Sequence, residues 1–337
     1  MRFSAFILAS ACALLIWSCE DSVNPKADVK DEYALFCIIN CDTTFQTAYL
    51  SKSYTVEGLD PQMNSIDPAV TGAQIKIEYV KDSETKLCTF KDSTAERNPG
   101  GRYEGPVKLY TAGNLDIKSP HIYGVPVPVS ITASLPGGKI LTASGRSIPS
   151  GDLLFSSSIR EYSPDTSPKN GLFKWEFLSS RNQEKDYCYR PAIIIRYIKI
   201  ENGVNVYKTI EIPSFTNLYQ DKEVLSYPGI TNSNSISYRL AYIQETLSRL
   251  SEGDNVKSNY IILGMDFVLR IMTRELAEYC AAGSTFKDEF SVRIDGSDIT
   301  NISGGLGIFG LYATKKIKIV LDKNLIRRLG YGYPEPN

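Results

Sequence analysis

The chain has 337 residues, of which 42% are hydrophobic, with 37 Lys and Arg against 38 Asp and Glu. The net charge of −1 excludes a strongly basic surface for nucleic acid, and the hydrophobic content excludes global disorder. The only histidine, His121, excludes metal sites that need several histidines. A chain of this length predicts about two domains.

The first residues predict an export signal. Arg2 precedes an almost continuous apolar run from Phe3 to Trp17, which is shorter than the ~20 residues of a membrane-spanning helix. Ile16-Trp17-Ser18-Cys19 then has the pattern of a bacterial lipobox. We therefore expect residues 1–18 to be a lipoprotein signal peptide and Cys19 to be lipidated. The alternative is an ordinary signal peptide, in which Cys19 is incidental.

A polar stretch and five cysteines follow. Residues 19–31 lack aromatic side chains, which is typical of a tether. An odd number of cysteines in an exported chain leaves at least one free thiol. In an extended strand Cys37 and Cys41 would lie about 13 Å apart, too far for a mutual disulfide. Either one of them pairs with Cys88, or all five are small buried hydrophobic side chains. The five are Cys37, Cys41, Cys88, Cys188 and Cys280.

Residues 32–150 predict an immunoglobulin-like β-sandwich. Ile75, Ile77 and Tyr79 alternate with polar residues, as in a half-buried strand. Pro136-Gly137-Gly138 predicts a hairpin between two strands. Runs rich in β-branched and aromatic residues recur between such turn signals, at 33–40, 45–56, 73–80, 85–90, 127–135 and 139–148.

Residues 151–337 predict a second β-rich domain, of the α+β class, with one or two short helices. Asn202-Gly203 predicts a hairpin between two of its strands. A strand that ends near Met272 is expected to lead into a helix from Thr273 to Ala282. The other strands are expected at 172–179, 188–200, 204–212, 236–242 and 315–321. The predicted fold class of the whole chain is therefore mainly β.

Gly305-Leu306-Gly307-Ile308-Phe309-Gly310 matches G-x-G-x-x-G literally. A dinucleotide fingerprint must open a helix, whereas the residues after Gly310 alternate like a strand. We therefore interpret the segment as structural, with positive φ at Gly304 and Gly305 and with its apolar residues packed on the core of the second domain. Its structural residues are Gly304, Gly305, Gly307, Phe309 and Gly310.

No candidate catalytic, cofactor or metal site emerges from the sequence. Asp295-Gly-Ser-Asp298 is interpreted as a turn, Asp288-Glu289 as a solvated pair of charges, and His121 as structural. We therefore expect a binding or structural protein rather than an enzyme. The alternative is a carboxylate-based hydrolase that acts on envelope polysaccharide or peptidoglycan.

The chain resembles a family of uncharacterised envelope lipoproteins of Gram-negative bacteria, classed as a domain of unknown function. The matching pieces are Cys19-Glu20-Asp21, the segments 69–75 and 268–279, and above all Asn301-Ile-Ser-Gly-Gly-Leu-Gly-Ile-Phe-Gly310. The resemblance implies an immunoglobulin-like domain followed by a β-rich domain. It also implies an outer-membrane location and a TonB-dependent receptor as a partner, with no catalytic residues.

Overall fold

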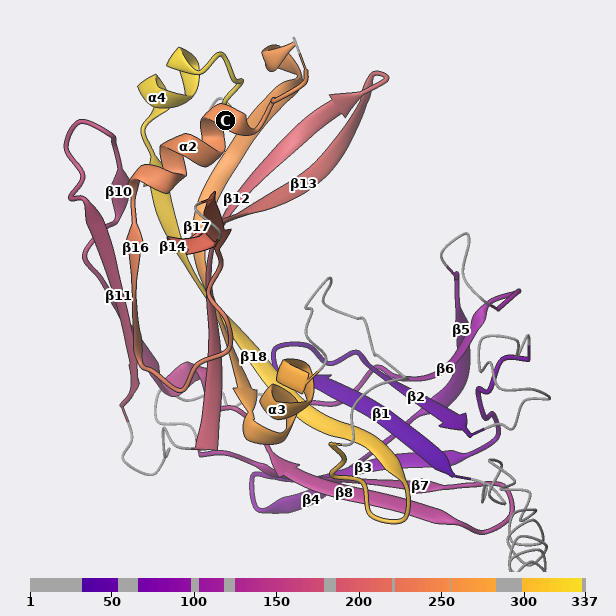
Figure 1. Ribbon diagram of the computed structural model, residues 1–337. Coiled ribbons are helices and arrows are strands. Elements are labelled where there is room, and N and C mark those ends of the chain that lie inside the picture. Colours follow the sequence, from indigo (N-terminus) through magenta and orange to yellow (C-terminus); the bar gives the residue numbers. More distant parts are fainter. Residues whose placement is uncertain are drawn as a thin grey trace, which may run out of the picture.

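The computed structural model describes residues 32–53, 66–97, 103–117, 125–178, 186–219, 222–254, 256–282 and 299–334. These residues form four β-sheets and three short α-helices (Figure 1). The predicted mainly β fold class is confirmed, and the sheets pack as sandwich-like layers.

The N-terminal part of the chain supplies two facing sheets. Strand β3 shows why: Ile75, Ile77 and Tyr79 are buried while the residues between them are exposed, so one face of the strand joins the core. One layer contains β1 (Tyr33–Asn40), β2 (Gln46–Lys52), β5 (Lys91–Ala95) and β6 (Val107–Ala112). The other contains β3 (Gln74–Lys81), β4 (Glu84–Thr89), β7 (Pro128–Ser134) and β8 (Ile140–Arg146).

Longer strands follow in the second half of the chain. β12 (Tyr187–Glu201) and β13 (Val204–Ile212) form the predicted hairpin, and Asn202 and Gly203 both have positive φ, as a tight two-residue turn requires. The other long strands are β17 (Tyr260–Thr273) and β18 (Leu306–Leu321), with β10 (Glu161–Tyr162) beside the end of β18. A separate three-stranded sheet contains β9 (Leu153–Ser157), β11 (Asn170–Phe177) and β16 (Ser235–Arg239).

The helices are short and lie at the ends of strands. Helix α3 directly follows β17 and runs to Ala282, as predicted, although the strand extends through Thr273. The Asp322 side chain accepts a hydrogen bond from the Asn324 N–H (2.8 Å) and so begins a helix that the sequence analysis missed. The helices are α2 (Ala241–Arg249), α3 (Arg274–Ala282) and α4 (Lys323–Arg328), with 3₁₀ turns at η2 (Ser150–Asp152) and η4 (Lys257–Asn259).

Strand β18 links the two halves of the chain in one sheet, with the order β13-β12-β17-β18-β1-β2-β6-β5. Its first half pairs in parallel with β1, from Leu306 opposite Ala34 to Tyr312 opposite Asn40. Its second half pairs antiparallel with β17. In Figure 1 the yellow β18 runs from one end of the molecule to the other. The chain's last strand therefore completes a sheet that its first strand begins, while the domain boundary near residue 150 stays a prediction.

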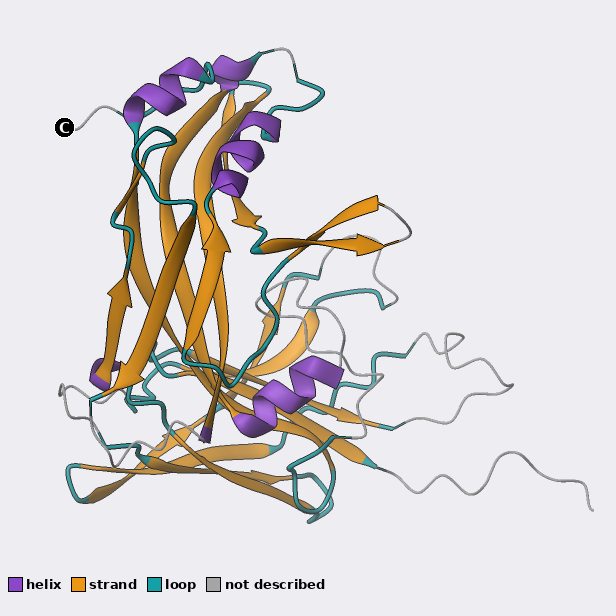
Figure 2. Cartoon of the chain, turned by 60° about the vertical axis from the view of Figure 1, so that its left-hand side comes forward, coloured by secondary structure: helices purple, strands orange, loops and turns teal. Residues whose placement is uncertain are grey.

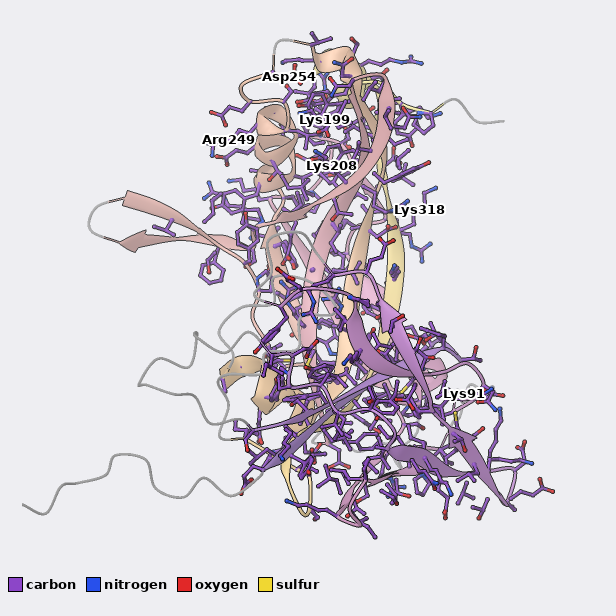
Figure 3. All side chains as sticks on the ribbon, turned by 90° about the vertical axis from the view of Figure 1, so that its right-hand side faces the viewer. Lys91, Lys199, Lys208, Arg249, Asp254 and Lys318 are labelled. Atoms are coloured by element: carbon purple, nitrogen blue, oxygen red, sulfur yellow. The ribbon has the colours of Figure 1, made fainter. Side chains whose placement is uncertain are left out.

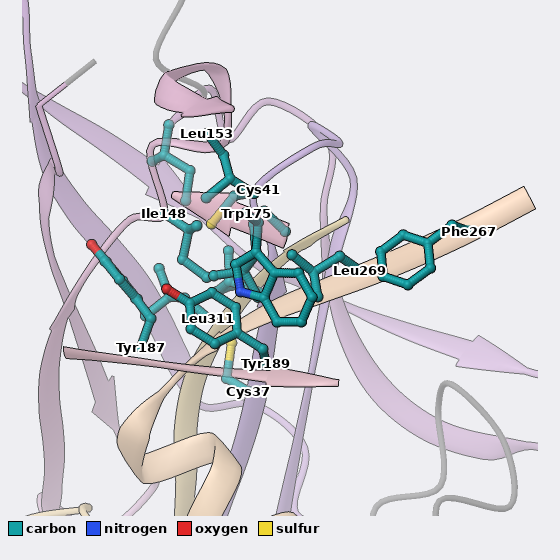
Figure 4. Close-up of a cluster of buried hydrophobic side chains, with 14 of the residues drawn as sticks. Cys37, Cys41, Ile148, Leu153, Trp175, Tyr187, Tyr189, Phe267, Leu269 and Leu311 are labelled. Atoms are coloured by element: carbon teal, nitrogen blue, oxygen red, sulfur yellow. The ribbon is translucent and has the colours of Figure 1, made fainter. Parts of the chain in front are cut away.

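An aromatic core lies between the long strands and the three-stranded sheet. The rings of Phe173 and Phe267 stack with centroids 4.2 Å apart, and Trp175 lies 5.5 Å from Tyr189. Figure 4 shows Trp175 and Tyr189 beside Leu311 of β18 and near Cys37 of β1. Side chains from both halves of the chain thus belong to one continuous hydrophobic cluster.

We expect Phe309→Ala to lower the free energy of unfolding by about 3–5 kcal/mol, because Phe309 is only 1% exposed and its removal leaves a cavity. Leu306→Ala in the same strand is the control, since Leu306 is 48% exposed and should cost about 0.5 kcal/mol or less. Urea unfolding of the purified chain, followed by circular dichroism, measures both. Equal losses would show that Phe309 does not anchor this strand.

Candidate binding surfaces

The glycines of the 304–310 segment are required by close backbone contacts. Gly304 has φ +84° as predicted, and Gly307 has φ +108°, whereas Gly305 lies outside the left-handed region. A Cβ on Gly305 would lie 2.4 Å from the Tyr33 carbonyl oxygen, and one on Gly307 only 2.1 Å from that of Leu35. The glycines at 305 and 307 therefore let the start of β18 approach β1 closely, and this approach is the geometric reason for the glycines at these positions.

The apolar residues of this segment differ from the prediction in where they pack. Phe309 joins the large shared core, but Ile308 packs with Phe36 of β1 and Tyr279 of α3 on the opposite face of the sheet. A Cβ on Gly310 would lie 2.7 Å from the Leu276 Cβ, so α3 presses directly on the strand. The expectation that all of the segment's apolar residues pack on the core of the second domain is therefore wrong for two of them, because Leu306 is 48% exposed and Ile308 packs against β1 and α3.

Two residues just before β18 hold this segment in place, Asn301 by bonding to β18 itself and Ser303 by bonding to the neighbouring sheet. The Asn301 side chain accepts a hydrogen bond from the Phe309 N–H (2.9 Å) and donates one to the Phe309 carbonyl (2.8 Å). An amide side chain thus replaces a neighbouring strand at that point of β18. Ser303 forms a two-way backbone bridge with Thr142 of β8. The residues before β18 therefore fasten it to the second layer of the sandwich.

A polar groove of about 510 Å³ opens beside this bridge. Ser130 is paired with Ser144, and Thr132 with Thr142, so four hydroxyl-bearing residues stand on the same face of β7 and β8. Hydroxyls donate and accept hydrogen bonds, which suits a polar ligand. The described lining consists of Ser130, Ile131, Thr132, Thr142, Ala143, Ser144, Glu275, Asn301 and Ser303.

The groove holds one carboxylate, that of Glu275, in the part of its lining that the structure describes. A glycosidase of the usual kind needs two carboxyl groups, about 5–10 Å apart. Asp288, Glu289, Asp295 and Asp298 lie outside the described residues. The described lining of the groove consists mainly of groups that form hydrogen bonds. It does not support the alternative of a carboxylate-based hydrolase.

A second surface is a hairpin that projects from the body, formed by β14 (Phe215–Tyr219) and β15 (Lys222–Ser226). Figures 2 and 3 show it standing away from the sheets as an arm. Three of its apolar side chains and the tyrosine just after it are 39–49% exposed, namely Phe215, Val224, Leu225 and Tyr227. A two-stranded hairpin is only marginally stable by itself, so contact with a partner would stabilise this one. Apolar groups gathered on a projection are typical of a surface that binds another protein.

The five cysteines that the structure describes are free thiols, so the predicted alternative of a disulfide with Cys88 is not formed. Cys37, Cys41 and Cys88 are buried, while Cys188 and Cys280 are half-buried. Burial raises the pKa of Cys41 to about 12 and that of Cys280 to about 11, and it raises the pKa of Cys37 further still. Protonated thiols of this kind behave as small hydrophobic side chains.

Several sequence predictions concern residues outside the described ranges. These are the signal peptide 1–18, Cys19, the tether 19–31 and His121. Among the helices that the structure describes, none is long and apolar enough to cross a membrane. In the same ranges, no three His, Cys, Asp or Glu side chains are grouped as metal ligands would be.

No protein-family model matches this sequence, and no curated protein is significantly similar to it. The resemblance to envelope lipoproteins therefore stays a prediction.

We expect Gly307→Ala to lower the free energy of unfolding by at least about 2 kcal/mol, because a Cβ there would collide with the Leu35 backbone and the residue has positive φ. Gly113→Ala is the matched control, since an added Cβ meets no atom within 4 Å and φ is not left-handed. Thermal and urea unfolding of the two variants provide the comparison. Unchanged stability in Gly307→Ala would contradict the close approach of β18 to β1.

Proposed function

We propose that the protein is a lipid-anchored lipoprotein of the cell envelope that acts as a binding or accessory module, with a TonB-dependent outer-membrane receptor as its partner. The observation that carries this proposal is the β14–β15 arm, whose exposed apolar side chains are gathered on a hairpin that projects from the body. Exposed apolar groups of this kind gain most when another protein covers them. The receptor as partner, and the outer membrane as location, rest on the resemblance of the sequence.

The proposed anchor fits such a role. An apolar run too short to span a membrane, then a lipobox and a polar stretch, is the pattern of a chain that is cut before Cys19 and held by acyl chains. Two or more acyl chains give stable anchoring, and a tether at 19–31 would leave the folded part free to reach a partner in the same membrane. The hydroxyl-lined groove would then be available for a polar ligand that the receptor handles.

We expect a fatty-acid analogue fed to cells to label the wild-type chain and not Cys19→Ala, because the diacylglyceryl group that carries the acyl chains is joined by a thioether to the sulfur of that residue. The measurement is in-gel detection of the label on the purified full-length chain. Cys280→Ala is the control, as that thiol is half-buried and lies outside the lipobox. Equal labelling of wild type and Cys19→Ala would refute the anchor.

We expect a photo-reactive amino acid at Val224 to cross-link the full-length chain to a TonB-dependent receptor in living cells, because the arm is the proposed docking element. The same substitution at Leu154 of β9 is the matched control, since the two side chains are 46% and 44% exposed. Mass spectrometry identifies the products. Equal yields at the two positions, or a Val224 product that contains no such receptor, would count against the proposal.

A further inference from the structure

Strand β13 leaves one edge of the largest sheet open. Among the strands that the structure describes, it is the last in the sheet order and pairs with β12 alone. A two-residue turn makes Glu201 and Val204 a hydrogen-bonded pair. From there along the hairpin, hydrogen-bonded pairs alternate with pairs whose backbone N–H and C=O groups point away from the partner strand. The outward N–H and C=O groups belong to Asn205, Tyr207, Thr209 and Glu211. Within the described chain, no backbone hydrogen bond reaches these groups.

The side chains along this edge do little to prevent another strand from pairing with it. Natural sheet edges are commonly blocked by proline, by a bulge or by inward-pointing charge, and residues 204–212 contain no proline and pair with β12 without a register shift. Lys208 is turned toward Glu201, with which it forms an ion pair. Tyr207 is 75% exposed and Val204 is 63% exposed. In Figure 3 this edge faces the viewer and the β14–β15 arm points away from it.

We propose that this edge binds the β13 strand of a second copy of the chain, antiparallel, about a twofold axis at Tyr207. In an antiparallel pair, the outward-pointing backbone groups of one strand must face the outward-pointing groups of the other. One strand can therefore shift along the other only by two residues at a time, and each such shift moves the twofold axis by one residue. Centred on Tyr207, the overlap brings Asn205 opposite Thr209 of the second copy. The inference is independent of the proposed receptor partner.

The side chains of β13 complement each other in this register. Val204 lies opposite Ile210 of the second copy, and Val206 lies opposite Lys208, whose methylene stem can cover it. The two exposed Tyr207 side chains meet at the axis. Directly opposed residues carry no like charges, and each Lys208, which is a diagonal neighbour of the other across the axis, is paired with its own Glu201. The pairing covers both of the strand's most exposed apolar residues.

The neighbouring registers are less favourable. One step along the strand places the axis at Lys208 and sets two ammonium groups directly opposite each other, which is destabilising. A further step, with the axis at Thr209, puts Val204 opposite Ser214, beyond the end of β13, and leaves the valine outside the strand pairing. A step the other way places the axis at Val206 and shortens the paired stretch to residues 204–208, because Thr209 then lies opposite Gly203 of the turn. The strand therefore fits this edge best with the axis at Tyr207.

The register is tested by disulfide cross-linking of full-length chains in native membranes. Val206→Cys and Lys208→Cys chains, tagged differently and co-expressed, should give a mixed disulfide dimer, because directly opposed residues of a non-bonded pair have Cα atoms about 4.5 Å apart. Either variant alone should give none, since like positions are then ~7–8 Å apart on the diagonal. Ile66→Cys, at a residue that is 75% exposed, and the wild-type chain with its native thiols are the controls.

A charge exchange at the axis separates pairing from folding. Tyr207→Glu and Tyr207→Lys should each weaken the dimer by about tenfold in sedimentation experiments on the detergent-solubilised chain, because like charges then meet at the axis. An equal mixture of the two variants should restore it. A wild-type chain that stays monomeric overturns the proposal. So does a dimer cross-linked by Lys208→Cys alone, or an adduct with a different protein in place of the mixed dimer.

Discussion

The approach of β18 to β1 is the contact on which the rest of the structure depends. The Leu35 carbonyl oxygen lies where a side chain of residue 307 would begin, so a parallel pairing at this point is open only to glycine. Parallel neighbours must be joined by a crossover, and here nearly the whole chain lies between the two strands. Closing so long a loop costs conformational entropy, which the tight backbone pairing and the shared core offset.

This pairing makes one core of what the sequence presents as two. Phe309, Leu311 and Ala313 belong to the same hydrophobic cluster as Trp175 and Phe267, and the cluster extends to residues of the first sandwich. A substitution in the glycine segment should therefore weaken both halves together. The three candidate binding surfaces lie outside this shared core. They are the arm after β13, the free edge of β13 and the hydroxyl-lined groove beside β8.

The two proposals use different surfaces and make separate demands on the molecule. The arm presents apolar side chains on a projection, where a partner of another kind can cover them. The edge of β13 presents backbone groups and a side-chain pattern that complements itself. A lipid-anchored pair of chains joined along β13 would carry two arms, and each arm would stay free for its own partner.

The mainly β class, most strand positions and both hairpins, at Pro136-Gly-Gly138 and Asn202-Gly203, could be predicted from the residues alone, because alternation and turn residues are local signals. The sequence could not reveal β5, whose residues Lys91–Ala95 are almost all polar, since a strand at a sheet edge needs only a neighbour to pair with. That β18 lies beside β1, and that the Asn301 side chain bonds to the backbone of Phe309, became visible in the folded chain and not before. The first contact joins strands far apart in the chain, and the second depends on how a side chain is oriented toward the backbone. Neither kind of contact produces a repeating pattern of residues that could be read in the sequence.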